Sequence, residues 1–421
     1  MVIAQRSCSR RGPTKGIPAT RGRLSPWINA CIAAVFLLTA AACSSPERMP
    51  AVPTADTASA FPLGLANARF FPSKEKAAML AEFEQAIQRQ RQALGVGPDA
   101  QLPTAYLLAI SGGGDNGAFG SGVLVGWTEA GDRPEFTLVT GVSTGALLAP
   151  FAFLGPAYDK QLRDVYTTVG ADDIFSERWL LNGIFNDAMA DTTPLWDLIS
   201  GYVDAPMLAA IGREYQKGRL LLIGTTDLDA QRGVIWNIGA IAASGHPGAV
   251  DLVRKILRAS SAVPGMFQPV MIDVEVDGKP YQELHVDGGA IQQMFLYPSS
   301  IDVRKLAHEE RKAYLIRNAR EDPEWADTER QTMSIAGRAV STMIHSSGWN
   351  DLLRIYFITQ QDGIDYNLAY IGSDFSPSEA GEFDKKYMNA LFDYGYQQAR
   401  RGYPWRKMPP GLPGSQGDDV E

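Results

Sequence analysis

The chain has 421 residues, of which 45% are hydrophobic and 20% are charged, a composition typical of a globular protein with one large domain or two ordinary ones. Residues 1–42 hold six of its 39 basic side chains and none of its 47 acidic ones, so the remainder has 33 basic and 47 acidic residues and a net charge of −14. Because binding to a phosphate backbone requires a basic surface, this balance argues against nucleic acid as a partner.

The first 42 residues are typical of a secretory signal. Basic side chains extend to Arg23, and the apolar run from Trp27 to Ala42 that follows is too short for a comfortable membrane span and ends in small residues. We therefore predict that residues 1–42 are a signal peptide.

Cys43 follows three alanines directly and precedes Ser44. This arrangement resembles the bacterial lipobox, in which the cysteine is lipidated and becomes the first residue of the mature protein. An ordinary cleaved signal is the alternative. The resemblance implies a lipid anchor at Cys43, and Ser44 after the cysteine implies a location in the bacterial cell envelope, on the outer membrane facing the periplasm.

Cysteines and histidines offer no pattern typical of a metal site. All three cysteines lie at or before residue 43, so the body of the chain has no disulfide framework. The four histidines are scattered without ligand-like spacing. We expect neither a metal nor a cofactor.

Residues 43–103 are predicted to form a tether and one helix. The stretch 44–63 is rich in Pro, Ala, Ser and Thr, as flexible linkers are. From Ser73 to Leu94 apolar residues recur at helical spacing, and Gly95 is a suitable C-cap.

An alternation of strands and helices begins at residue 104 and predicts an α/β core over residues 104–300. Strands are expected at Ala105–Ile110, Phe136–Thr140 and Leu220–Ile223, with a helix from about Gly117 to Glu129. Runs that are apolar on both faces belong to buried, mostly parallel strands. The expected fold is therefore three-layer α/β/α with a mostly parallel central sheet.

Residues 301–421 are predicted to be a helical region packed on this core. Candidate helices cover Thr332–Ile344 and Trp349–Ile358, and the capping box Ser376–Glu379 predicts the start of a long helix that ends near Arg401.

Ser143 lies in the pentapeptide Gly141-Val142-Ser143-Thr144-Gly145, between a predicted strand and a predicted helix. This is the context of a nucleophile elbow, a sharp turn that needs small flanking residues and exposes the serine at a helix N-terminus. The pattern indicates that Ser143 is a nucleophile.

Three consecutive glycines, Gly112, Gly113 and Gly114, follow the first predicted strand. Their backbone N–H groups could form an oxyanion hole or a phosphate cradle. The sequence of this loop also fits the Gly-x-Gly-x-x-Gly motif of a dinucleotide-binding turn, which would make the chain a nucleotide-binding oxidoreductase. However, a dinucleotide-binding fold requires an acidic residue at the end of the second strand, and this chain has Gly141 at that position.

Asp287 precedes two glycines in His285-Val286-Asp287-Gly288-Gly289. It could be a carboxylate delivered at a strand end or a simple turn residue, because Asp-Gly is a common turn pair.

Together these motifs resemble the patatin-like phospholipases and acyl hydrolases. That family has Gly-Gly-Gly-x-x-Gly, then Gly-x-Ser-x-Gly, then Asp-Gly-Gly or Asp-Gly-Ala, and Ala259–Pro264 looks like its Ala-Ser-x-Ala-x-Pro segment. The resemblance covers residues 104–295. It implies a patatin-like fold and a serine–aspartate dyad with Ser143 as nucleophile and Asp287 as general base, and it places the oxyanion hole at Gly112, Gly113 and Gly114.

The resemblance also implies a lipid acyl hydrolase of the esterase or phospholipase A type, held at a membrane through lipidated Cys43. One departure is Asn116, which stands where the family usually has Arg or Lys. Its neutral side chain weakens the case for a phospholipid over a neutral ester.

Two alternatives remain open at this point. A triad is formally possible with His285, His308 or His345 as the base. The chain could also be a catalytically degenerate, patatin-fold lipoprotein that acts as a binding or scaffolding protein. Head group, acyl-chain length and oligomeric state are not determined by the sequence.

Overall fold

A computed structural model describes residues 48–177, 190–299, 301–305, 310–322, 325 and 327–414. The predicted signal peptide and Cys43 lie outside these residues. Residues from Pro46 to Glu421 belong to one compact unit. Among the described residues, none of the helices combines the length and the apolar character needed to cross a membrane.

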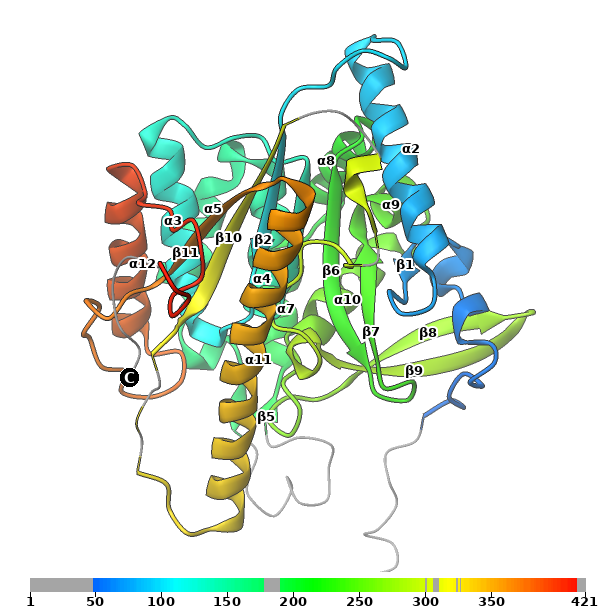
Figure 1. Ribbon diagram of the computed structural model, residues 1–421. Coiled ribbons are helices and arrows are strands. Elements are labelled where there is room, and N and C mark those ends of the chain that lie inside the picture. The colour runs from blue at the N-terminus through cyan, green and yellow to red at the C-terminus, as the bar shows by residue number, and fades with distance from the viewer. Residues whose placement is uncertain are drawn as a thin grey trace, which may run out of the picture. The chain divides into compact units, whose positions relative to one another are not determined.

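A nine-stranded sheet forms the centre of this unit (Figure 1). Its order is β1-β7-β6-β3-β2-β10-β11, and the β8–β9 hairpin joins it at β6. Neighbours from β6 to β11 are parallel, whereas β1, β7 and the hairpin pair antiparallel. The strands are β1 (Arg69–Phe70), β2 (Ala105–Ile110), β3 (Leu138–Val142), β6 (Leu220–Asp227), β7 (Arg232–Asn237), β8 (Val270–Val276), β9 (Lys279–Asp287), β10 (Arg311–Arg320) and β11 (Asp365–Ile371), with β4 (Ser176–Glu177) and β5 (Ala190–Asp191) as a separate pair.

Helices cover both faces of the sheet. In Figure 1, α11 crosses in front of the strands and α4 lies behind them. The helices are α2 (Lys76–Leu94), α3 (Gly117–Ala130), α4 (Thr144–Leu154), α5 (Asp159–Thr167), α7 (Thr193–Tyr202), α8 (Ala205–Gln216), α9 (Ile238–Ala243), α10 (Ala249–Ser260), α11 (Thr332–Asp362) and α12 (Lys385–Arg400).

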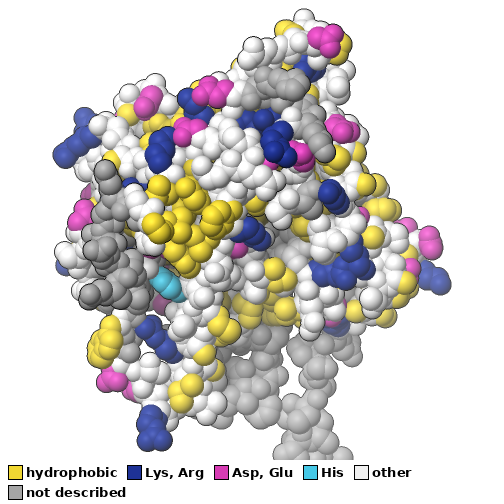
Figure 2. Space-filling model, in the orientation of Figure 1, with side chains coloured by type: hydrophobic (Ala, Val, Ile, Leu, Met, Phe, Trp, Pro, Cys, Tyr) yellow, Lys and Arg dark blue, Asp and Glu magenta, His cyan; other side chains and the backbone are white. Residues whose placement is uncertain are grey.

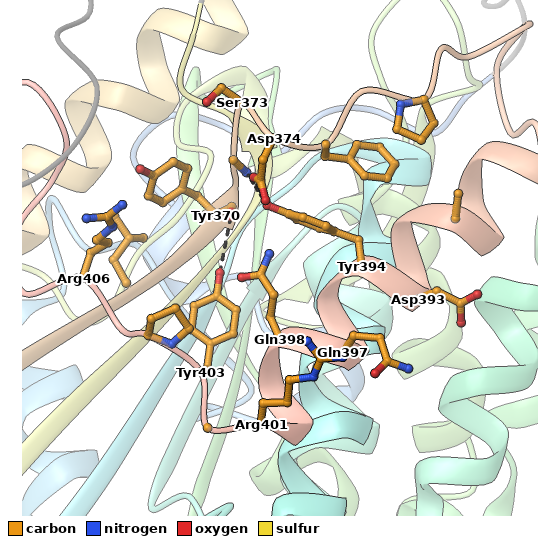
Figure 3. Close-up of a pocket in the computed structure, with 17 residues that line it drawn as sticks. Tyr370, Ser373, Asp374, Asp393, Tyr394, Gln397, Gln398, Arg401, Tyr403 and Arg406 are labelled. Carbon is orange, nitrogen blue, oxygen red and sulfur yellow. Dashed lines mark hydrogen bonds between the residues drawn. The ribbon is translucent and has the colours of Figure 1, made fainter.

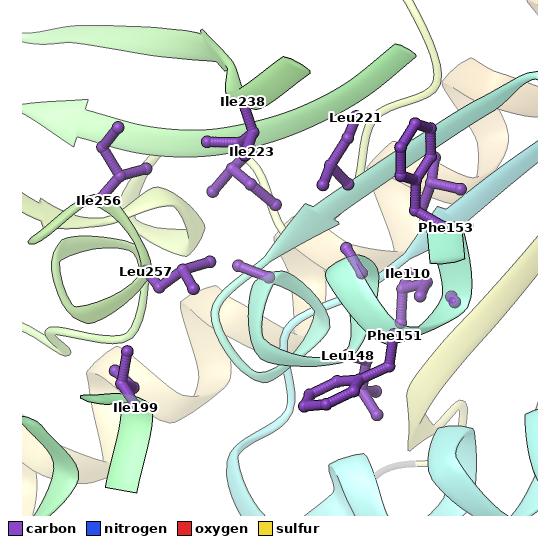
Figure 4. Close-up of a cluster of buried hydrophobic side chains, with 14 of the residues drawn as sticks. Ile110, Leu148, Phe151, Phe153, Ile199, Leu221, Ile223, Ile238, Ile256 and Leu257 are labelled. Carbon is purple, nitrogen blue, oxygen red and sulfur yellow. The ribbon is translucent and has the colours of Figure 1, made fainter. Parts of the chain in front are cut away.

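Alternate residues of each parallel strand enter two different hydrophobic cores. Leu108 and Ile110 of β2 pack in the core that contains α3, α4, α10 and α12, while Leu107 and Ala109 pack in the core that contains α2 and the second half of α11. Figure 4 shows the first core, where Leu148 of α4 lies near Ile110. Burial on both faces explains why these strands are apolar throughout.

The predicted fold class is confirmed, because the sheet is mixed, mostly parallel and flanked by helices. The C-terminal region, however, is not only helical. Its strand β10 lies between β2 and β11, with Leu315 opposite Ala109, so residues after 300 complete the central sheet.

Three local predictions differ from the structure. The two helices expected after residue 330 are one helix, α11, which continues through Gly348, where a Cβ would overlap the Arg317 guanidinium. The long helix α12 does not begin at Ser376–Glu379 but at Lys385, where Asp384 caps it by accepting from the N–H of Lys386.

The expected tether, residues 44–63, also differs from the structure, which describes this stretch from residue 48 onwards. The carbonyl of Pro50 accepts from the N–H of Gln282 in β9, and Phe61 forms a bridge with Glu275 in β8. Val52 and Ala60 are buried. This stretch therefore packs on the hairpin instead of hanging free.

Candidate active site

Ser143 occupies a sharp turn between β3 and α4. Its φ and ψ are 55° and −128°, a conformation that a non-glycine residue rarely adopts. A Cβ on Gly141 would overlap the backbone of Gly145, and a Cβ on Gly145 would overlap the carbonyl of Ile110. The glycines of the pentapeptide are thus required by close backbone contacts, and the serine sits at the N-terminus of α4 as the sequence predicts.

Ser260, at the end of α10, holds this turn from the other side. Its Oγ accepts from the N–H of Ser143 at 2.9 Å and donates to the carbonyl of Gly224 at 2.7 Å. Ser260 is fully buried. Because both groups would be unsatisfied without this hydroxyl, Ser260 stabilises the strained backbone of Ser143.

Asp287, at the end of β9, lies next to Ser143. Its Oδ1 accepts from the N–H of Gly289 at 2.7 Å, and its own N–H donates to the carbonyl of Ala262 at 2.9 Å. Burial raises the pKa of the Asp287 carboxyl to about 7, although hydrogen bonding to the Ser143 side chain and to Gly289 lowers it. A carboxyl with this pKa can take up and release a proton near neutral pH, as a general base must.

The glycine loop, residues 112–114, follows the end of β2 and lines the same cavity as Ser143 and Asp287. Gly113 has φ 155° and Gly114 has φ 58°, both unfavourable for other residues. The N–H of Gly112 already donates to the carbonyl of Gln293 at 3.1 Å. The N–H groups of Gly113 and Gly114 have no acceptor among the described residues, so these two are the amides best placed to serve the predicted oxyanion hole.

Asn318, on β10, holds the glycine loop in place. Its Nδ2 donates to the carbonyl of Ser111 at 2.9 Å, its N–H donates to Ser111 Oγ at 2.8 Å, and its Oδ1 accepts from the N–H of Gly120 at 3.1 Å. A Cβ on Gly113 would overlap the Asn318 carbonyl. The loop therefore takes its shape from a strand that enters the sheet more than 200 residues later.

A cavity of about 560 Å³ joins these groups. Its lining includes Ser143, Asp287 and the glycine loop, and it also includes these apolar residues: Val263, Pro264, Ala290, Val340, Met343 and Ile344. The last three belong to α11. An apolar wall beside a nucleophile is suited to the hydrocarbon part of a substrate.

A larger cavity, of about 1000 Å³, lies elsewhere, between β11 and α12 (Figure 3). Tyr394 of α12 donates to Asp374 there, and Tyr403 donates to the carbonyl of Tyr370. None of the residues named above for the turn and the glycine loop lines it. Size alone therefore does not identify the site.

His285 belongs to a buried polar cluster behind Asp287. Its Nδ1 is 3.0 Å from Thr225 Oγ1 and its Nε2 is 3.2 Å from Glu283 Oε2. Burial raises the pKa of Glu283, but hydrogen bonding to His285 and the charge of Arg69 outweigh it and hold that pKa at about 2. With both ring nitrogens engaged, His285 is not placed to act on Ser143.

The same cluster brings Asp227, Glu283 and His285 within 4.8 Å of one another, close enough for a metal ion. Arg69 forms a two-point ion pair with Glu283. The guanidinium therefore already supplies the positive charge that these carboxylates need.

The other two candidate histidines differ from each other in position. His308 lies outside the described residues, whereas His345, on α11, lines the cavity that contains Ser143. His345 thus remains an alternative base to be tested.

Asn116 also lines the cavity, and its Oδ1 accepts from the hydroxyl of Tyr387 at 2.8 Å. Two arginines of β10 reach the same cavity. Arg317 donates to Glu321 at 3.2 Å, and Arg320 donates to the carbonyls of Gly372 and Phe375. Both guanidinium groups are therefore held in structural contacts.

Sequence reasoning missed Ser260 as a support and Asn318 altogether. Ser260 lies within Ala259–Pro264, the segment that resembles the family's Ala-Ser-x-Ala-x-Pro motif, but the motif by itself assigns no role to this serine. Asn318 follows the apolar run Ala313–Ile316, which has the length and composition of a strand. A polar residue directly after a predicted buried strand indicates a candidate site residue, and this pattern could have identified Asn318.

Comparisons with known proteins identify one family and several solved structures. Residues 108–297 match the model of the patatin-like phospholipase family. Among solved structures, VipD from Legionella pneumophila is 11% identical, with a TM-score of 0.35 over 71% of this chain and 66% of that one. Human GIVD cytosolic phospholipase A2 is also 11% identical, with a TM-score of 0.35 over 79% of this chain and 64% of that one.

The chain thus spans about two thirds of the length of these two structures. No curated protein is similar enough to count as a match. The resemblance inferred from the motifs agrees with this match, which covers residues 108–297.

Proposed function

We propose that this protein is a lipid acyl hydrolase that uses Ser143 as nucleophile and Asp287 as general base, through an acyl-enzyme. The observation that carries the proposal is the meeting of a strained serine at a helix N-terminus with a buried carboxyl whose pKa is about 7. The match to the patatin-like phospholipase family over residues 108–297 supports it.

The first half of the reaction forms the acyl-enzyme. Ionised Asp287 accepts the proton of Ser143 Oγ as Oγ attacks the ester carbonyl. The N–H groups of Gly113 and Gly114 donate to the oxyanion, and the dipole of α4 favours the same negative charge. The carbon–oxygen bond of the ester then breaks, and Asp287 gives its proton to the leaving alcohol.

In the second half, Asp287 accepts a proton from water, and the resulting hydroxide attacks the acyl carbonyl. The bond to Ser143 Oγ breaks, and the proton returns from Asp287 to the serine. One carboxyl thus serves both halves, which requires a pKa close to the working pH.

The acyl chain is proposed to lie against Val340, Met343 and Ile344 of α11, and the ester carbonyl next to the glycine loop. Asn116 brings no charge to the cavity, and Arg317 is ion-paired with Glu321. A carboxylic ester of a lipid is therefore the proposed substrate, with phospholipid and neutral ester both compatible with the cavity.

We further propose that the protein is lipidated at Cys43 and held at the bacterial outer membrane, facing the periplasm. The support is the alanine-rich segment directly before Cys43 and Ser44 after it. Mass spectrometry of the mature N-terminus tests this proposal: an acylated Cys43 is expected, and a mature chain that begins elsewhere would contradict it.

Labelling with a fluorophosphonate probe tests the catalytic proposal. Wild type is expected to be labelled, whereas Ser143→Ala is not and Asp287→Asn is labelled at least a hundredfold more slowly. Ser373→Ala is the matched control, because that serine lines the other cavity and should label like wild type. Labelling of Ser143→Ala, or no labelling of wild type, would overturn the proposal.

His345→Ala separates the dyad from a triad. The dyad predicts labelling within a few-fold of wild type, because Asp287 itself takes the proton. If His345→Ala lost labelling as fully as Asp287→Asn, the base would be the histidine. A folded wild-type protein that fails to label would instead favour the binding or scaffolding role.

A further inference from the structure

The first half of α11, Thr332–Ser346, which we call the tip of α11, forms a wall of the active-site cavity and also projects from the body of the protein. Figure 1 shows it extending below the sheet. The second half is anchored by Leu352 and Ile355, which are buried. The tip has no such anchor residue among its described side chains.

Apolar side chains on the tip are exposed. Ile335 is 54% exposed, Val340 is 37% exposed and Met343 is 62% exposed. Figure 2 shows small groups of hydrophobic atoms on the lower part of the molecule, into which α11 extends, and a larger group higher on the same face. Val340 and Met343 also line the cavity, so part of the exposed apolar surface of the tip belongs to the cavity lining.

Charge distinguishes the tip from the rest of the protein. The chain carries 47 acidic residues, yet from Thr332 to Asn350 the sequence has none, and Arg338 is the only charged side chain of that stretch. An acidic group would be costly to bring against lipid, whereas a single arginine can extend its guanidinium towards head groups. The composition suits contact with a lipid surface.

We propose that the tip of α11 docks on a lipid surface and delivers a lipid ester from that surface directly to the cavity of Ser143. A helix that lies at a membrane interface buries its apolar side chains at the boundary between head groups and acyl chains. Since Met343 belongs both to the tip and to the cavity wall, an acyl chain passes from lipid to protein without crossing water. The inference rests on the proposed lipid hydrolase function.

Vesicle binding tests this proposal with the chain from residue 44, which keeps the whole compact unit Pro46–Glu421 and has no acyl anchor. Wild type is expected to sediment with phosphatidylcholine vesicles. Ile335→Glu should lower the partition coefficient tenfold or more, equivalent to about 1.4 kcal/mol. Hydrolysis of a soluble short-chain ester should stay within twofold, because Ile335 does not line the cavity.

Phe357→Glu is the matched control. Phe357 lies on the second half of the same helix and is 60% exposed, so the substitution removes a similar apolar surface away from the cavity. It should leave the partition coefficient within twofold. Equal losses for Ile335→Glu and Phe357→Glu, or no loss for Ile335→Glu, would overturn the proposal.

A site-specific probe gives a second measurement. The chain from residue 44 has no cysteine, so Ile335→Cys carries a single environment-sensitive fluorophore. Its emission should shift to the blue with vesicles, and the same label at Gln397 on α12 should not shift. Failure of wild type to bind vesicles, with intact fluorophosphonate labelling of Ser143, would overturn the docking surface but not the proposed function.

A second copy of the chain is the competing occupant. Light scattering distinguishes it: a wild-type dimer that Ile335→Glu converts to a monomer, with no vesicle binding, would replace the lipid surface with self-association.

Discussion

Burial and hydrogen bonding shift the pKa of the Asp287 carboxyl in opposite directions. Burial favours the neutral carboxyl, while Ser143 and Gly289 favour the carboxylate, and burial dominates with a pKa of about 7. A general base benefits from this compromise, because a carboxylate of ordinary pKa would take a serine proton poorly.

The raised pKa predicts the pH dependence of activity. Only the ionised form can accept the proton of Ser143, so kcat/KM for a soluble ester should rise with pH, reach half its maximum near pH 7 and level off above pH 8. Initial rates between pH 5 and 9 measure this profile. Equal rates at pH 5 and pH 8 would show that Asp287 is not the base.

The same shift predicts a change in stability. A carboxyl whose pKa is raised on folding contributes stability below its unfolded pKa of 3.8, and loses it as the pH rises through about 7. Asp287→Asn should therefore be more stable than wild type at pH 8, by about 2–4 kcal/mol, with the difference shrinking towards pH 4. Calorimetric Tm values at both pH values would show it, and a smaller difference at pH 8 than at pH 4 would contradict the sign.

Among the elements, the glycine loop depends on its neighbours for its shape. Three consecutive glycines have no conformational preference that would aim their N–H groups. Ser111 and Gly120, on either side of the loop, are both hydrogen-bonded to Asn318 of β10. The proposed oxyanion donors are thus positioned by a strand outside the matched residues 108–297.

Removing this support should affect turnover more than binding. Asn318→Ala removes the side-chain hydrogen bonds to the Ser111 carbonyl and the Gly120 N–H, so kcat should fall by about 10- to 100-fold with KM changed less than threefold. Steady-state kinetics on a soluble ester measure kcat and KM separately and so test this prediction.

Asn367→Ala is the control for Asn318→Ala. Asn367 is also buried, on the adjacent strand β11, and donates to the carbonyl of Ala313 away from the cavity. It should lower Tm without lowering kcat. If both variants lost turnover alike, the role of Asn318 would be general stability.

At the scale of the whole molecule, the α/β core that contains Ser143 and the C-terminal region share one sheet. The whole of β2 pairs with β10, and β10 pairs with β11 on its other side. α11 supplies part of the cavity wall, and α12 packs on α3 in the first core. A domain boundary at residue 300 therefore divides a single sheet.

A chain that ends at residue 300 should fail to fold, although it contains the whole matched region. Without β10, β2 becomes an edge strand, and Leu107, Leu108 and Ile110 lose cover. Circular dichroism and a cooperative melting transition test this outcome. A chain that ends at residue 414 should melt like the full-length protein, and cooperative melting of the shorter chain would show that the core is independent.

The sequence by itself determined the local parts of this protein. Strand, turn and helix around Ser143 are adjacent in the chain, and the glycines there are dictated by contacts within a few residues, so a motif can specify them. The apolar strand Ala105–Ile110 and the C-cap Gly95 were predictable for the same reason.

Tertiary structure decided which distant groups meet. Asp287 stands beside Ser143 because β9 pairs with β6 and β6 with β3, and Asn318 reaches the glycine loop because β10 pairs with β2. The cavity wall on α11 depends on how that helix crosses the sheet. Strand order arises from long-range packing of faces that look alike in sequence, so hydrophobic periodicity predicts each strand but not its neighbours.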